Sequence, residues 1–429
     1  MAPSRPVASL LLCGLLVVSC SGEPGDQPST NPPATAGITT TVPNPLLVAG
    51  EMYGEIRERN LAPGADGAAV NEMIRGTNEF ALRLYREVAG DTNLVVGNYS
   101  ISTVLLLTMA GTAGETREGF SHLLGVAEVD PARLHPAVNA IDLVLEGRAG
   151  DGLQLNTANR LFAQVGLPLE EEFLNVAVES YGAPAVGVDF SRVEEVADLV
   201  NQWVAAETDG FVQELTQGYS PETVLVLANA MYLKARWAVP FRLLEEPGSF
   251  TTLSGEEVST PVMAHDDFLP SFSGPDYTAV ELPYVGGNLS LVVVQPTDFE
   301  AFEDELSLGR LEEIFDRLEE GGIHLTMPIW STETSLELLN TLHALGLPAT
   351  YDFSAMIEGG EQGFFIDSVS HVARIEVDET GTTAGAATDV AIAVSHGPTV
   401  TIDRPYLYFV RDRGSGVILF MGQVVDPTA

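Results

Sequence analysis

The segment 379–398 constrains the fold of this chain more than any other part of the sequence. Its first ten residues carry no large side chain, so they favour neither a helix nor a packed loop. If the segment is a β-strand, it has two different faces, because successive side chains of a strand point to opposite sides. One face presents Thr382, Ala384, Ala386, Thr388, Val390 and Ile392, and the other presents Thr383, Gly385, Ala387, Asp389, Ala391 and Ala393.

Asp389 is the charged residue of this strand, and it lies on the second face. The first face is uncharged, so the segment can enter between two strands of an existing sheet without burying a charge over the core. The alternative is a surface linker of small residues, which does not require Asp389 to fall on the outer face. The pattern therefore favours an exposed segment that is able to become a strand.

The first residues of the chain predict export. Arg5 gives a positive start, residues 7–18 form an apolar run too short to span a bilayer, and Ser19 stands directly before Cys20. This resembles the lipobox of bacterial lipoproteins, so we expect residues 1–19 to be a cleaved signal peptide and Cys20 to be lipidated. An ordinary secretory signal is the alternative. The protein is then a membrane-anchored lipoprotein at the cell surface or in the periplasm, or it is secreted into the extracellular space.

The composition excludes several kinds of site. Both cysteines, Cys13 and Cys20, lie in the leader region, so the mature domain can form no internal disulfide and has no thiolate site. The net charge of −40 excludes nucleic-acid binding as the main role, because that binding needs clustered Lys and Arg. An acidic surface with a single lysine, Lys234, fits a salty exterior and a GC-rich genome equally well.

Beyond the leader, the sequence predicts a tether and one domain. Residues 20–66 begin as a Pro-, Gly-, Ser- and Thr-rich stretch, and we expect a flexible tether that ends in a short extension. Residues 67–429 alternate helix and strand patterns without a second linker. The predicted class is α+β with substantial sheet. Short apolar runs predict buried strands at 224–233, 289–295 and 417–421.

Two amphipathic helices are predicted from capping signals. Ser191 and Glu194 form a capping-box pattern before an apolar face that ends at Gly210. Thr334 and Glu337 repeat the pattern ahead of a second apolar face. Each helix is expected to pack its apolar face on another element.

Catalytic signatures are absent from the sequence. It has no Gly-x-Ser-x-Gly, no His-Glu-x-x-His, no Gly-rich phosphate loop with Lys and no acidic calcium loop. We therefore expect no enzyme activity, no metal and no cofactor. A hydrolytic lipoprotein is an alternative, but it would need a set of catalytic residues that is not recognisable in this sequence.

Motifs from Asn78 to Pro427 resemble those of one family, the serpins, in family order. Residues 379–388 are similar to the hinge of the serpin reactive-centre loop. Other matching segments are Asn78-Glu79-Phe80-Ala81, Gly111-Thr112-Ala113-Gly114-Glu115-Thr116, Ala158-Asn159-Arg160-Leu161-Phe162, Asn201-Gln202-Trp203-Val204, Asn229-Ala230-Met231-Tyr232-Leu233-Lys234, Glu281-Leu282-Pro283-Tyr284 and Phe420-Met421-Gly422-Gln423-Val424.

The resemblance implies the serpin fold: a large central antiparallel or mixed β-sheet, additional sheets, about eight to nine helices and an exposed reactive-centre loop at about 379–400. It also implies a serine protease inhibitor that acts as a suicide substrate. The protease attacks the loop, the acyl-enzyme forms, and the severed loop inserts into the main sheet, serpins being the standard example of such strand addition. The native state is then metastable.

The same resemblance assigns roles to individual residues. Ser100, Asn229 and His371 correspond to a polar shutter cluster beneath the sheet, and Trp237 marks the point where the loop enters. The family's Ser-Pro before the second helix is replaced by Gly97-Asn98, which removes one hydroxyl. The hinge corresponds to Glu379, Gly381, Thr382, Thr383, Ala384, Gly385, Ala386, Ala387 and Thr388.

The cleaved bond is expected between Val394 and Ser395, with the bond between Ser395 and His396 as the next choice. No Lys or Arg lies between Thr388 and Val400, so a trypsin-like pocket has nothing to bind. The expected partner is an elastase-like or subtilisin-like serine protease, held as a covalent acyl complex. We expect the inhibitor to be a monomer that contacts a membrane only through its lipid. A non-inhibitory serpin-fold lipoprotein with a binding or structural role is the alternative.

Overall fold

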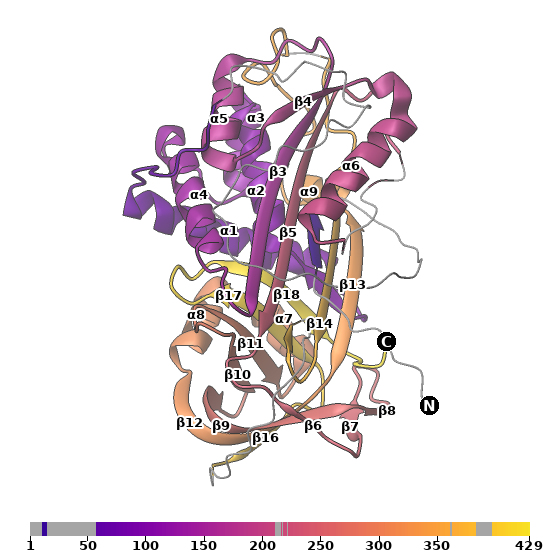
Figure 1. The fold of residues 1–429 in the computed structure, drawn as a ribbon. Coiled ribbons are helices and arrows are strands. Elements are labelled where there is room, and N and C mark those ends of the chain that lie inside the picture. The colour runs from indigo at the N-terminus through magenta and orange to yellow at the C-terminus, as the bar shows by residue number, and fades with distance from the viewer. Residues whose placement is uncertain are drawn as a thin grey trace, which may run out of the picture.

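The computed structural model describes residues 11–14, 57–210, 216, 218–220, 222–360, 363–382 and 397–429, and Figure 1 gives their arrangement. These residues form nine α-helices. Their bounds are α1 Gly67–Val88, α2 Asn98–Ala110, α3 Gly114–Leu123, α4 Pro131–Glu146, α5 Glu171–Tyr181, α6 Val193–Glu207, α7 Phe299–Glu305, α8 Leu308–Asp316 and α9 Leu339–Ala344. None of the helices in this part of the chain combines the length and apolar character needed to cross a bilayer.

The main sheet has seven strands. In spatial order they are β13 (Trp330–Glu337), β14 (Ser370–Val377), β1 (Leu11–Gly14) together with β15 (Gly381–Thr382), β5 (Leu225–Arg236), β3 (Leu153–Gln164) and β4 (Ala185–Val188). The sheet is mixed, because β3 and β4 run parallel while β3 and β5 run antiparallel. Both β1 and β15 therefore lie between β14 and β5.

A second sheet of nine strands packs below the first in Figure 1. Every residue of its central strands β11 and β18 is buried. Its order is β16 (Thr399–Thr401), β12 (Glu319–Pro328), β9 (Val262–Ser273), β10 (Tyr277–Pro283), β11 (Leu289–Pro296), β17 (Tyr406–Asp412), β18 (Ile418–Val424) and β2 (Leu94–Val96). Short strand β6 (Arg242–Leu243) joins β9, and β7 (Gly248–Thr251) pairs with β8 (Glu257–Thr260).

The two faces of β5 bury different clusters. Met231 and Leu233 belong to the large core that also contains residues of α1 and α2. Ala228 and Ala230 pack instead with Trp203 of α6, which crosses the other face of the sheet in Figure 1. Since side chains alternate along a strand, odd-numbered residues of β5 face the core and even-numbered residues face α6. Because residues opposite each other in paired strands have their side chains on the same face, this alternation determines which residues of a strand next to β5 face the core.

The predicted α+β fold with a large mixed central sheet is confirmed, and the three predicted strands are found as β5, β11 and β18. The two capping predictions are wrong in detail. Helix α6 begins at Val193 without a side-chain cap. The capping residue is Asp189 rather than Ser191, and it caps the 3-10 turn Phe190–Arg192 that precedes the helix. Thr334 lies in β13 opposite Ala373, because pairing in the sheet overrides the local helix signal.

Candidate functional site

β5 and β14 are separated by short strands along the length that they share. Gly381 and Thr382 of β15 pair with Arg236 and Ala235 of β5, and Thr382 also pairs with Val377 of β14. Farther along, β1 lies between the same two strands. Over the residues that the structure describes, β5 and β14 form no ladder with each other. We call the space between residues 229–236 and 371–377 the slot.

Trp237 and Tyr284 form the entrance of the slot. Their rings stack with centroids 4.8 Å apart and planes 6° from parallel, and Trp237 is 3% exposed. The indole Nε1 donates to the carbonyl of Asp378 at 2.8 Å. The backbone N–H of Trp237 donates to the Thr380 carbonyl at 3.1 Å. Trp237 therefore holds Asp378 and Thr380, which flank Glu379, the first residue of the predicted hinge.

The hinge residues within the described part of the chain are fixed to this entrance. The Glu379 carbonyl accepts from the N–H of Phe241 at 2.7 Å. Gly381 has no room for a side chain, because a Cβ would lie 2.2 Å from the Ala235 oxygen. Thr382 is fully buried, and its Oγ1 lies 2.7 Å from the Tyr284 hydroxyl. Tyr284 was not predicted as a site residue, although it lies in one of the recognised motifs.

Ser100 and Asn229 are brought together beneath the sheet. The Ser100 hydroxyl of α2 donates to Asn229 Oδ1, and Asn229 Nδ2 donates to Asn159 Oδ1 at 2.6 Å. Asn159 Nδ2 in turn donates to the carbonyl of Tyr181 at 2.9 Å. Sequence reasoning missed Asn159, which is paired with Asn229 in the ladder of β3 and β5. The chain of bonds joins α2, β5, β3 and α5.

His371 is bonded separately from that chain. Its Nε2 accepts from the Gly97 N–H at 3.0 Å, so Nδ1 carries the proton of the neutral ring. The Nδ1 atom is buried and has no hydrogen-bond partner among the described residues. Burial lowers the pKa of His371 to about 3. The predicted shutter cluster thus has two parts, and Gly97 contributes its backbone where the family has a side-chain hydroxyl.

A cavity of about 280 Å³ opens at the end of the slot farthest from Trp237. Leu225 and Leu227 of β5 line one side, and Phe364 and Val369, which lead into β14, line another. Thr108 of α2 also lines the cavity. The site is therefore a strand-sized gap that is polar in its middle and apolar at its far end.

Several predicted site residues lie outside the described part of the chain. They are Cys20, Thr383, Ala384, Gly385, Ala386, Ala387, Thr388, Val394, Ser395 and His396. Within the part that is described, no three His, Cys, Asp or Glu side chains lie together as a metal site would require. The loop returns at Pro398, whose carbonyl accepts from the N–H of His324 at 3.1 Å.

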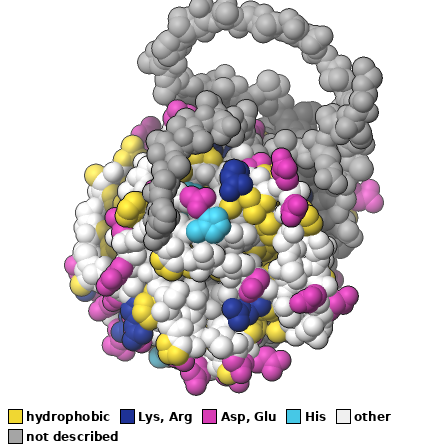
Figure 2. Space-filling model, turned by 90° about the horizontal axis from the view of Figure 1, so that it is seen from below, with side chains coloured by type: hydrophobic (Ala, Val, Ile, Leu, Met, Phe, Trp, Pro, Cys, Tyr) yellow, Lys and Arg dark blue, Asp and Glu magenta, His cyan; other side chains and the backbone are white. Residues whose placement is uncertain are grey.

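The end of the molecule that carries β16 is acidic at its surface. Seen from this end, Asp and Glu side chains are spread over the visible face with few Lys and Arg between them (Figure 2). The pattern agrees with the net charge of −40. Acidic groups around a binding site favour approach by a partner of opposite charge.

Comparison with known sequences finds one family. A family model described as Serpin (serine protease inhibitor) matches residues 75–427. An uncharacterised serpin-like protein of Thermococcus kodakarensis is 31% identical over 436 residues, which cover 97% of this chain and 98% of its own. Plasminogen activator inhibitor 1 of Mus musculus is 31% identical over 375 residues, which cover 81% of this chain and 91% of its own.

Solved structures give the same fold. Human thyroxine-binding globulin in complex with thyroxine superposes with a TM-score of 0.76 at 26% identity, covering 84% of this chain and 100% of that one. The thermophilic serpin tengpin in its native state superposes with a TM-score of 0.75 at 22% identity, covering 86% and 96%.

The neutral state of His371 predicts a pH dependence of stability. Because the unfolded chain binds a proton below about pH 6.5 and the folded protein does not, the folded state loses stability as pH falls. The loss between pH 6.5 and pH 5 is about 2 kcal/mol. His371→Gln keeps an acceptor for the Gly97 N–H but cannot titrate, so its unfolding free energy should fall less over this range. Equal losses in urea titrations of both proteins would show that His371 is not the titrating group.

Proposed function

The chain belongs to the serpin family, and from that premise we propose that it is an exported serine protease inhibitor that traps its target by inserting its loop into the slot. The observation that carries the proposal is the pairing of Gly381 and Thr382 with β5 and of Thr382 with β14 as well. The first two residues of the strand are thus already in the sheet. The rest of the loop needs only to continue along the same two edges.

The register of β15 fixes where the following residues would lie. Continued along β5 and β14, it sets Ala386 opposite Met231 and Ala373, and Thr388 opposite Asn229 and His371. Strand β1 supports this register, because Leu12 pairs with the same Met231 and Ala373 and runs in the same direction. The slot therefore has the width and register of one additional strand.

The two faces of the inserted strand would meet suitable surroundings. With the register extended, residues 384 and 386 would lie opposite Leu233 and Met231, which belong to the core, so the uncharged face would turn inward. Val390 and Ile392 would lie opposite Leu227 and Leu225, toward the cavity. Burying these side chains stabilises the inserted form by about 1.5–3 kcal/mol for each fully buried Val or Ile.

Thr388 fits the polar middle of the slot. In this register its side chain falls between Asn229 and His371, where the Nδ1–H of His371 has no partner among the described residues. The threonine hydroxyl can accept that hydrogen bond once the loop has inserted. A buried donor without a partner costs about 1–3 kcal/mol, so the native state is less stable than the inserted state by this contribution among others.

The reaction with the protease follows from this difference in stability. The serine of the protease attacks the carbonyl of Val394, the bond to Ser395 breaks, and the new amino group takes the proton from the protease's general acid. The ester remains while the severed strand enters the slot and carries the protease along the sheet. A displacement of about 1 Å in the protease's active site costs about a hundredfold in rate, so deacylation becomes slow and the ester persists.

Export and lipidation form part of the same proposal. Residues 11–14 occupy the slot in the full chain, so removing residues 1–19 would free the place that the loop needs. Lipidated Cys20 would then hold a monomeric inhibitor at a membrane through residues 21–56. The alternative of a binding role is kept open by the shared fold, since the thyroxine-binding globulin structure holds thyroxine.

A protease panel tests the proposed function. The segment between Thr388 and Val400 offers small and medium apolar residues but no Lys or Arg. An elastase or a subtilisin should give a complex that survives boiling in detergent, and trypsin should give none. Cleavage by all of these proteases without any stable complex would make the protein a substrate or a binding protein instead.

Replacing Thr388 by Val tests the polar contact in the slot. Thr388→Val keeps the shape of the side chain but removes the acceptor for His371, so the cleaved protein should lose about 1–3 kcal/mol of stability and the intact protein almost nothing. Thr383→Val, on the opposite face of the strand, is the matched control and should leave both forms unchanged. The measurement is urea unfolding of each form, and an equal effect of the two substitutions would contradict the proposed register.

A further inference from the structure

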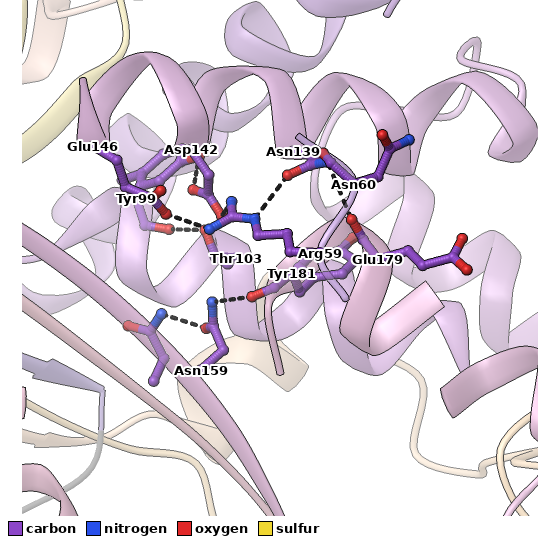
Figure 3. A network of polar contacts seen from close by, with 11 residues as sticks. Arg59, Asn60, Tyr99, Thr103, Asn139, Asp142, Glu146, Asn159, Glu179 and Tyr181 are labelled. Atoms are coloured by element: carbon purple, nitrogen blue, oxygen red, sulfur yellow. Dashed lines mark hydrogen bonds and ion pairs between the residues drawn. The ribbon is translucent and has the colours of Figure 1, made fainter. Parts of the chain in front are cut away.

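Residues 57–60, which precede α1, bind the helices beside the main sheet (Figure 3). Arg59 contacts three residues of α4. Its Nε donates to Asn139 Oδ1 at 2.9 Å, one Nη donates to Asp142 Oδ2 at 3.2 Å, and the other pairs with Glu146. The planar guanidinium suits such a set of acceptors, because its five N–H groups have fixed directions. We call Arg59 and Asn60 the clamp.

The clamp also reaches α5. The backbone N–H of Asn60 donates to the Glu179 carbonyl at 3.1 Å. Asn139 Nδ2 of α4 donates to the carbonyls of both Asn60, at 2.6 Å, and Glu179, at 3.1 Å. Three segments far apart in the sequence therefore meet at one point.

Asp142 is the buried charge that Arg59 compensates. The side chain of Asp142 is 2% exposed, and that of Arg59 is 18% exposed. The hydroxyl of Tyr99 in α2 donates to Asp142 Oδ1 at 2.5 Å. Burial raises the pKa of Asp142 to about 6, while Tyr99 and Arg59 act in the opposite direction. Without Arg59, the carboxylate would remain buried without its cation, which is strongly unfavourable.

The contacts of the clamp are continuous with those of the slot. Tyr99 is followed in α2 by Ser100, whose hydroxyl binds Asn229 of β5. From Asn229 the bonds run through Asn159 to the carbonyl of Tyr181, at the end of α5. The path thus starts at the clamp, passes through α4, α2, β5 and β3, and returns to α5. Since β5 is one wall of the slot, any further separation of β5 from β14 would disturb this path.

We propose that the clamp slows the entry of a strand between β5 and β14, with Arg59 as the positioning residue. The proposal rests on the loop insertion proposed above, and it assigns Arg59 and Asn60 to control of that step. The coupling is carried by hydrogen bonds on both sides of the backbone link between Tyr99 and Ser100, and it acts on β5, which is one wall of the slot. Loss of the clamp then increases the rate at which the slot accepts any strand.

Uptake of a peptide measures this rate without a protease. A synthetic peptide with the sequence of residues 381–394 is mixed with the intact mature protein, and the complex is followed by native mass spectrometry. Arg59→Met should bind the peptide about tenfold faster than the wild type, which corresponds to about 1.4 kcal/mol of barrier. Arg59→Lys keeps the charge but cannot reach all three acceptors, so its rate should lie between these two. Arg59→Lys also provides the comparison if Arg59→Met does not fold.

Two matched variants separate the clamp from general stability. Arg57 pairs with Glu179 at 2.9 Å and Glu171 at 3.5 Å, both in α5, so Arg57→Met should bind the peptide at the wild-type rate. Arg148 pairs with the fully buried Asp412 at 2.7 Å. Arg148→Met therefore leaves an equally buried carboxylate without its cation, and it should lower the urea midpoint without changing the uptake rate.

The outcomes distinguish this inference from the proposed function. A wild-type rate for both Arg59 variants, or an equal acceleration by Arg148→Met, would refute the clamp. Peptide uptake with the expected differences, but no covalent complex with any protease, would reject the inhibitor function and leave the clamp standing. Uptake by none of the proteins would reject both, because the slot would then accept no strand.

Discussion

The facing edges of β5 and β14, which do not pair with each other over the described residues, are the constraint on which the rest of the structure depends. Both strands are central in a large sheet, yet over the described residues only the short strands β15 and β1 lie between them. A buried edge leaves backbone N–H and C=O groups that favour the addition of another strand. The protein therefore contains a strand-acceptor site inside its own main sheet, and in the proposed mechanism the free energy of filling that site drives the displacement of a bound protease.

The residues around the slot follow from this constraint. A strand can enter only where the backbones approach closely. The residue that meets the Ala235 carbonyl has no room for a side chain, and this residue is Gly381. Trp237 stacked on Tyr284 fixes the point of entry. Beneath the slot, the hydrogen bonds of Ser100 and Asn229 hold α2, β5 and β3 together. Tyr99, which precedes Ser100 in α2, binds Asp142, the partner of Arg59, so α2 connects the slot with the clamp.

Patterns local in sequence predicted much of the fold, and contacts between distant segments explain most of what they missed. The apolar run of β5 was predicted correctly because strand periodicity is a local property. Thr334 was predicted to cap a helix because its pairing with Ala373 is not visible locally. Asn159 gains its role from its register partner Asn229, and Arg59 from Asn139, 80 residues later. The motif resemblance supplied Trp237 and His371, which periodicity alone does not single out.

Thermal unfolding before and after a single cut between residues 389 and 396 tests the central claim most directly. If the severed segment becomes a strand between β5 and β14, the cut protein gains ladder hydrogen bonds and buried apolar area, and its melting temperature rises above that of the intact protein. A cut protein that melts at the same temperature as the intact one, or below it, would contradict the account.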